Sequence, residues 1–159
     1  MAYATFQQLE SAYHQDFLDR IALRANEDVD SVVIQARCEA SLDAAAGVID
    51  SYLNRAYAVP VVTPVLSAQA ALRNCCMALA VADLIAQKGY IEGTEDASLV
   101  DHITKRYLNT PNGWLYRVGA GSVVIPGAIS SSDGSSTSSP DGFYCVSEEP
   151  YFPPSSLYV

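Results

Sequence analysis

The segment from Val65 to Lys88 constrains the fold more than any other part of the chain, because it is rich in Ala, Leu and Cys and carries few charges. A helix built from such a segment is apolar around most of its circumference, so other parts of the protein must cover it. Its most apolar stretch, Cys75 to Ile85, contains Asp83 and is shorter than the roughly 20 residues that span a bilayer. We therefore expect the central helix of a folded domain, with Gly89 as its C-cap, and no membrane span.

A second long helix is expected to begin near Asp30, where acidic and capping side chains suit the positive end of a helix. We expect Val59-Pro60 and Thr63-Pro64 to end this helix and start the central one, because the residue before proline avoids the α region. Thr63 is the expected N-cap of the central helix, with Pro64 in its first turn. The apolar residues of the second helix recur every three or four positions and form one stripe: Ile34, Cys38, Leu42, Ala45, Ile49, Tyr52, Leu53 and Ala56.

Shorter helical segments complete the pattern. Thr5 and Gln8 have the spacing of a capping box, in which each side chain binds the backbone amide of the other residue. Thr94, which two acidic residues follow, has the form of another helix start. The expected helices run from Phe6 to about Tyr13, from Asp16 to Leu23, and from Thr94 towards Gly119, the last one broken or capped anew at Thr110-Pro111.

The composition of the chain changes abruptly after Gly121. Residues 122–129 are rich in β-branched residues and include Pro126, which suits an edge strand or an extended segment. Residues 130–140 are almost all Ser, Thr, Gly, Asp and Pro, which is typical of a flexible linker. With 159 residues, 50% of them hydrophobic, the chain fits one domain with a tail. We expect an all-α fold: a small helical bundle over residues 1–121 built on two long central helices, then the strand or extended segment, the linker, and an extended arm over residues 141–159.

The arm is too aromatic to be only a solvated end of the chain, so we expect it to need a receptor surface. Two interpretations stay open, since the arm can fold back on its own domain or add as an extended peptide to another chain. Its large apolar side chains are candidates for contact with a partner or a neighbouring subunit: Phe143, Tyr144, Tyr151, Phe152, Leu157 and Tyr158.

The charge balance argues against several classes of function. Nine Lys and Arg stand against eighteen Asp and Glu, which leaves a net charge of −9 and a pI near 4.4. Such a surface lacks the basic footprint that grips nucleic acid, and anionic membranes repel it. No secretory signal is visible in residues 1–10, so we expect the chain to stay in a cytosol with its four cysteines as reduced thiols.

No combination of residues predicts an active site, a cofactor site or a metal site. The two histidines, His14 and His102, have no nucleophile in a matching pattern. Cys75 and Cys76 are neighbours on a helix, so their side chains point about 100° apart and cannot both face one metal ion. An enzyme that uses Cys75, Cys76 or His102 is the least favoured alternative.

Several stretches of the chain share their residues with one family of proteins. The most specific is the string Ile49-Asp50-x-Tyr52-Leu53-x-x-x-Tyr57-x-x-Pro60. Others are the opening Met1-Ala-Tyr3-Ala-Thr5 with Leu9, the run from Ala40 to Pro60, Pro64 with the Ala/Leu helix after it, and Lys105-Arg106-Tyr107 through Trp114-Leu115 to Gly121. Over most of Tyr3 to Gly127 the chain resembles the Mu-like family of phage head-to-tail connector proteins, and the ending from Pro150 to Tyr158 is similar to the short aromatic ending of some members.

The resemblance implies a non-catalytic virion protein without cofactors. It implies a homo-oligomeric ring, typically twelvefold, which assembles in the host cytoplasm, lies beneath the portal protein in the virion neck, and presents a surface to the tail or a neck protein. Genomic DNA passes through such a ring. Acidic residues along its channel would repel DNA phosphates and let the genome slide. The candidates for this lining are Glu27, Asp28, Asp30, Glu92, Glu95, Asp96 and Asp101.

Two further alternatives stay open. Arg55 and Tyr57, near the end of the second helix, are candidates for contact with a partner, and equally for a local pair that orients the turn at Pro60. For the whole chain, the alternative from another class is a small cytosolic helical binding or regulatory module. Such a module would share the bundle and the arm but would remain a monomer or dimer.

Overall fold

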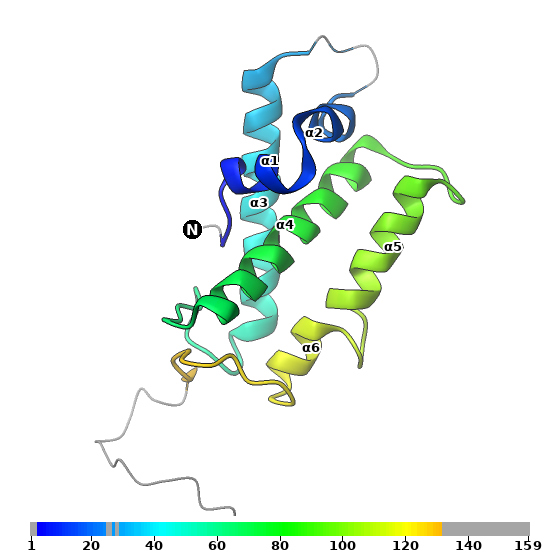
Figure 1. Ribbon diagram of the computed structural model, residues 1–159. Coiled ribbons are helices and arrows are strands. Elements are labelled where there is room, and N and C mark those ends of the chain that lie inside the picture. The colour runs from blue at the N-terminus through cyan, green and yellow to red at the C-terminus, as the bar shows by residue number, and fades with distance from the viewer. Residues whose placement is uncertain (1–2, 25–26, 28, 132–159) are drawn as a thin grey trace, which may run out of the picture.

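The chain folds into a bundle of helices, of which the computed structural model describes residues 3–24, 27 and 29–131 (Figure 1). The helices are α1 (Phe6–Tyr13), α2 (Gln15–Ala22), α3 (Ser31–Leu53), α4 (Leu66–Lys88), α5 (Glu95–Tyr107) and α6 (Trp114–Gly119). The long helices α3 and α4 cross and pack against each other, with α1 and α2 towards one end and α5 and α6 on the other side. The expected all-α bundle on two long central helices is confirmed.

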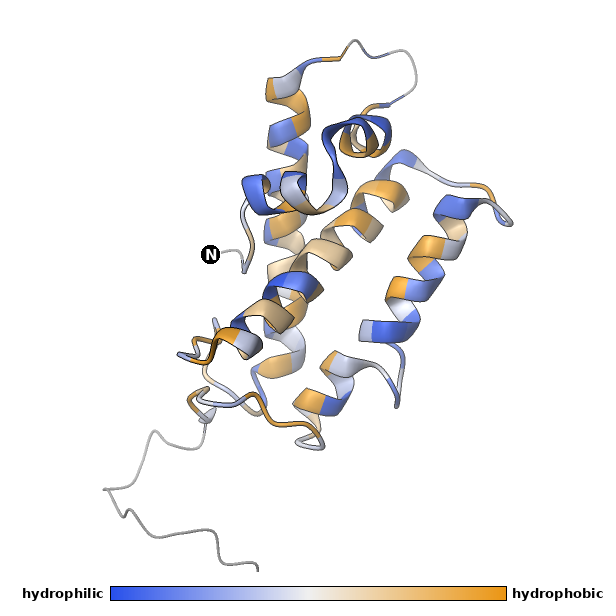
Figure 2. Cartoon of the chain, in the orientation of Figure 1, coloured by the Kyte–Doolittle hydropathy of each residue, from blue (hydrophilic) through white to orange (hydrophobic). Residues whose placement is uncertain are grey.

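The core of the bundle lies where α4 is enclosed by the other helices. Every residue from Cys75 to Val81 is buried, and the stripe of α3 that faces them includes Ile34, Cys38 and Ile49 at 1% exposure or less. Figure 2 shows that α5 likewise turns its hydrophobic residues towards α4. By length and composition alone α4 could cross a membrane, with a mean hydropathy of 1.3, but 61% of the apolar window is buried inside the fold.

Most helix ends coincide with the capping residues expected from the sequence. Thr5 caps α1 through a complete capping box with Gln8. Asp30 caps α3 by accepting a backbone N–H of its first turn at 2.9 Å, and Thr94 caps α5 in the same way. Gly89 ends α4 at a φ of +84°, a left-handed conformation that glycine adopts without steric cost.

The junction between α3 and α4 differs from the expected one. The helix α3 already ends at Leu53, and α4 begins only at Leu66, with Val65 as an N-cap that makes no side-chain hydrogen bond. The prediction that Thr63 caps α4 is therefore wrong. The Thr63 hydroxyl donates to the backbone oxygen of Pro126 and accepts the N–H of Val65, so this buried side chain ties the loop to the segment after α6.

The segment after α6 returns to the end of α3 in an extended path without forming a strand. Within the described residues, a single antiparallel bridge, between Tyr57 and Ser130, pairs it with the loop that follows α3. Backbone hydrogen bonds beside this bridge join Ile129 to Ala58 at 3.0 Å and Ser131 to Ala56 at 3.1 Å. The packed part of the chain thus reaches Ser131, inside the segment expected to be a linker, and residues 132–159 lie outside the described part.

Candidate interaction surfaces

One end of the molecule carries exposed large apolar side chains. The α3–α4 loop and the segment after α6 lie together there, since Thr63 binds Pro126 and Ala58 binds Ile129. Val62 is 72% exposed and Leu66 is 79% exposed, and apolar side chains gathered in this way mark a surface for contact with other molecules. We call this group the apolar end surface; it consists of Val59, Val62, Leu66, Val124 and Ile129 (Figure 2).

A second exposed apolar patch lies at the beginning of α3. It consists of Val29, Val32 and Val33, of which Val32 is 72% exposed, and we call it the α3-start patch. The rest of α3, from Val33 to Leu53, lies between this patch and the apolar end surface and is about 30 Å long at 1.5 Å per residue (Figure 1). Because the two patches differ in residues and position, copies can join head to tail, with one patch of each copy against the other patch of its neighbour. Such heterologous contacts generate a ring when they close.

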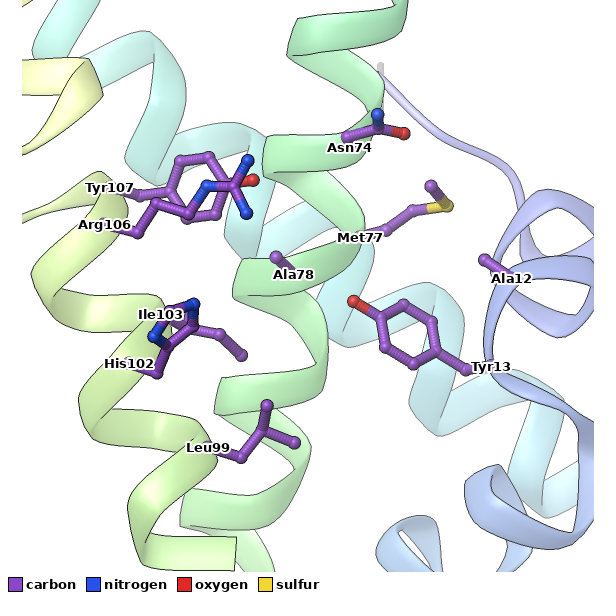
Figure 3. A pocket seen from close by; sticks show the side chains of 10 residues that line it. All are labelled: Ala12, Tyr13, Asn74, Met77, Ala78, Leu99, His102, Ile103, Arg106 and Tyr107. Atoms are coloured by element: carbon purple, nitrogen blue, oxygen red, sulfur yellow. The ribbon is translucent and has the colours of Figure 1, made fainter.

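A groove runs along α4 between α1 on one side and α5 on the other. Three cavities of about 410, 420 and 590 Å³ adjoin there, because the first shares Asn74 and Arg106 with the second and Met77 with the third. Figure 3 shows the first cavity, with Tyr13 reaching in from α1, Met77 from α4 and Tyr107 from α5. We call the three cavities together the α4 groove; its lining is Thr5, Gln7, Gln8, Ser11, Ala12, Tyr13, Ser67, Ala70, Ala71, Arg73, Asn74, Met77, Ala78, Leu99, His102, Ile103, Arg106, Tyr107 and Trp114.

The α4 groove has a charge opposite to that of the whole chain. Its lining contains Arg73 and Arg106 and no Asp or Glu, although the chain has a net charge of −9. Neither arginine forms an ion pair with another described residue, and the Arg106 guanidinium lies 5.3 Å from the centre of the Tyr107 ring. Burial raises the pKa of Tyr13 and of Tyr107, so both phenols stay neutral near pH 7. The groove is therefore a locally positive, partly aromatic surface.

Several acidic residues expected to line a channel have other partners. Hydrogen bonds from Arg37 lower the pKa of Glu27 to about 2. Asp30 is occupied as the cap of α3, and Asp28 lies outside the described residues. The ion pairs among the described residues are Arg20 with Asp96 at 3.0 Å, Arg37 with Glu27, and Lys105 with Asp101 at 2.6 Å. Of the expected channel residues, Glu92 and Glu95 are thus the ones in the described part that neither pair with a cation nor cap a helix.

The two contact candidates at the end of α3 have different environments. Arg55 is exposed, and its backbone oxygen accepts a hydrogen bond from the Ser131 hydroxyl at 3.1 Å. Tyr57 is only 7% exposed, and its hydroxyl accepts the backbone N–H of Ile125 at 2.9 Å. Tyr57 therefore fits the local structural interpretation, whereas the Arg55 side chain is accessible to a partner. The remaining candidates lie outside the described residues: Phe143, Tyr144, Tyr151, Phe152, Leu157 and Tyr158.

The string that begins at Ile49 joins separate parts of the fold. Asp50 accepts a hydrogen bond from the Tyr3 hydroxyl, which in turn accepts the backbone N–H of Val61 at 2.8 Å. Ile49 and Leu53 are fully buried on the same helix. The string thus connects the start of the chain, α3 and the α3–α4 loop. Sequence reasoning did not find the contact of Tyr3 with Asp50, because their separation along the chain follows no local pattern.

The titratable groups usual in catalysis are dispersed in the described part of the chain. There, no group of three or more His, Cys, Asp and Glu residues could hold a metal ion. Cys38, Cys75 and Cys76 are buried free thiols, and burial raises their pKa, to about 11 for Cys38 and Cys76, so they are not thiolates near pH 7. His102 is exposed on α5, where it lines the α4 groove.

Comparison with known proteins agrees with the motifs at the start of the chain and in α3. No curated protein sequence matches the chain. The sequence model of one family, described as Bacteriophage Mu, Gp36, matches residues 3–141, which include the whole described body from Tyr3 to Ser131. Because this match covers well over half of the chain, the protein belongs to the Bacteriophage Mu, Gp36 family.

Proposed function

We propose that this phage protein is a non-catalytic head-to-tail connector. In this role, copies of the chain form a ring beneath the portal protein, the tail or a neck protein attaches to the ring, and DNA passes through it. The protein is made in the host cytoplasm and acts in the neck of the virion. The observation that carries this proposal is the pair of exposed apolar patches at opposite ends of α3.

The two patches support a ring because they are not equivalent. A two-fold dimer buries the same patch of each copy, whereas a ring buries one patch of each copy against a different patch of its neighbour. The α3-start patch and the apolar end surface offer two such surfaces, each with a valine that is 72% exposed. A closed ring covers both patches on every copy and leaves neither of them in water.

The charge of the chain supports passage of DNA through the ring. A net charge of −9 gives the protein no sequence-independent affinity for phosphates, so DNA that passes through the ring is not held by it. Glu92 and Glu95 are the acidic residues that we propose for the channel lining, since neither pairs with a cation within the described part. A ring lined mainly by Lys and Arg would contradict this assignment.

The test is co-sedimentation of the purified full chain with portal-bearing, DNA-filled heads. Wild-type chain is expected to bind as a complete ring, counted as copies per head. Val32→Asp and Val62→Asp each place a charge in one of the two patches, and we expect each to prevent ring closure. Ile91→Asp is the matched control, because Ile91 is 78% exposed and lies in neither patch, so its binding should equal that of the wild type.

A mixture of the two patch variants makes the test specific for heterologous contacts. Val32→Asp keeps an intact apolar end surface and Val62→Asp keeps an intact α3-start patch, so the two can form one junction with each other and no closed ring. Absence of wild-type binding would overturn the connector proposal in favour of the small binding or regulatory module. Full rings from either patch variant would show that ring contacts lie elsewhere.

A further inference from the structure

We infer that the α4 groove binds the C-terminal arm, residues 141–159, of its own chain. This inference goes beyond the connector proposal and does not depend on it. The groove lies between three helices and presents arginine and aromatic side chains to solvent. A surface of this chemistry suits an extended peptide that carries carboxylates and aromatic rings.

Charge complementarity identifies the arm as the occupant. Residues 132–159 contain Asp133, Asp141, Glu148 and Glu149 and no Lys or Arg. The groove contains Arg73 and Arg106 and no acidic residue, and neither arginine has an ion-pair partner within the described part of the chain. The charged side chains of the arm are therefore all negative, and those of the groove are all positive.

Acidic and aromatic residues are neighbours in the arm, as arginine and aromatic side chains are neighbours in the groove. Glu148 and Glu149 stand just before Tyr151 and Phe152, so an acidic pair and an aromatic pair follow each other along an extended peptide. In the groove, Arg106 lies next to the Tyr107 ring and shares a cavity with Met77. The carboxylates of the acidic pair can bind Arg106 while the rings of the aromatic pair pack against Tyr107 and the Met77 thioether.

The attachment of the chain at Ser131 favours its own arm over that of a neighbour. Ser131 is held beside Ala56, at the end of the bundle where α4 begins. From Leu66, Asn74 lies about 12 Å along α4 at 1.5 Å per residue, whereas residues 132–140 span about 30 Å when extended. The arm can thus reach the groove of its own chain, and a short tether gives it an effective concentration in the millimolar range.

Methyl NMR of methionine tests this inference in the full chain. Met1 and Met77 are the two methionines of the protein, so labelling gives one signal from the groove and one from the start of the chain. In the wild type we expect the Met77 methyl to be shifted by the ring current of a docked aromatic side chain. The shift should be lost in the double variant Tyr151→Ala/Phe152→Ala and kept in the matched control Ser155→Ala/Ser156→Ala.

A charge exchange tests the arginine contacts separately. Arg106→Glu should abolish the Met77 shift, and adding Glu148→Arg/Glu149→Arg to that variant should restore it. Arg106 is exposed, so these changes leave the core intact. An identical Met77 signal in the wild type and the Tyr151→Ala/Phe152→Ala variant would overturn the inference. A shift that disappears on dilution would also overturn it, because the arm would then come from a second copy.

Discussion

At the scale of single residues, two tyrosine hydroxyls hold segments that are far apart in the chain. Tyr3 binds both Asp50 of α3 and the backbone of Val61, and Tyr57 binds the backbone of Ile125. Burial, together with the hydrogen bond to Asp50, raises the pKa of Tyr3 well above its usual range, so Tyr3 remains a neutral donor to a carboxylate. Such charge-assisted bonds are about twice as strong as bonds between neutral groups.

Removal of the Tyr3 hydroxyl should destabilise the fold without changing its apolar packing. Tyr3→Phe leaves Asp50 without this donor and Val61 N–H without its acceptor, which should lower the free energy of unfolding by about 1–3 kcal/mol. Urea denaturation followed by circular dichroism measures the change. Tyr90→Phe is the control, since Tyr90 is 45% exposed, and should differ from the wild type by no more than about 0.5 kcal/mol. Equal losses in both variants would contradict this role of Tyr3.

At the scale of helices, the short helix α6 lies against α3 at a position that only glycine permits. A Cβ atom at Gly119 would lie 2.4 Å from the backbone oxygen of Tyr52. Close contact at this point brings Leu115 and Val118 of α6 into the core, where both are fully buried. The position of α6 therefore depends on the absence of one side chain at its end.

Two glycine-to-alanine substitutions should have opposite effects on stability. Gly119→Ala forces α6 away from α3 and should lower the free energy of unfolding by about 1–3 kcal/mol. Gly47→Ala lies in the middle of α3, where a Cβ meets no atom within 4 Å, and should raise it by about 0.5–1 kcal/mol through better helix propensity. Thermal unfolding of both variants measures the difference. A stabilised Gly119→Ala would show that α6 tolerates a shift away from α3.

At the scale of the whole molecule, the last described residues are hydrogen-bonded to the loop that follows α3. Residues 128–131 contribute the bridge to Tyr57 and the backbone bonds to Ala56 and Ala58. Side-chain bonds from Ser130 and Ser131 to the backbone of α3's end add to this closure. The folded body therefore includes the first part of the segment whose composition alone suggests a linker.

A comparison of two truncations should locate the end of the folded body. A chain that ends at Ser131 keeps all of these contacts, whereas a chain that ends at Gly127 loses the bonds of Ile129 and Ser131 to α3's end. We expect both chains to fold and the shorter one to be less stable by about 1–3 kcal/mol. Urea denaturation of the two chains in parallel measures this, and equal stability would place the end of the body before residue 128.

Local signals in the sequence predicted the helices well, because capping and apolar periodicity act over a few residues. The ends at Thr5, Asp30, Gly89 and Thr94 agree with the structure for this reason. Thr63 is the exception, since its hydroxyl binds Pro126, a residue that is remote in sequence and invisible to a local pattern. The α4 groove and the two apolar patches were not predicted either, because each depends on which helices lie side by side.

The bridge between Tyr57 and Ser130 also determines how the body responds to tension on the end of the chain. A force applied at residue 132 acts first on the hydrogen bonds of Ser131 and then on the bond between Ala58 and Ile129. These hydrogen bonds therefore break one after another and not all together. The bond of Tyr57 to Ile125 and that of Thr63 to Pro126 carry load only after these have opened. A modest force thus detaches residues 128–131 from the body in steps before it acts on the core. The helices stay folded while these residues detach.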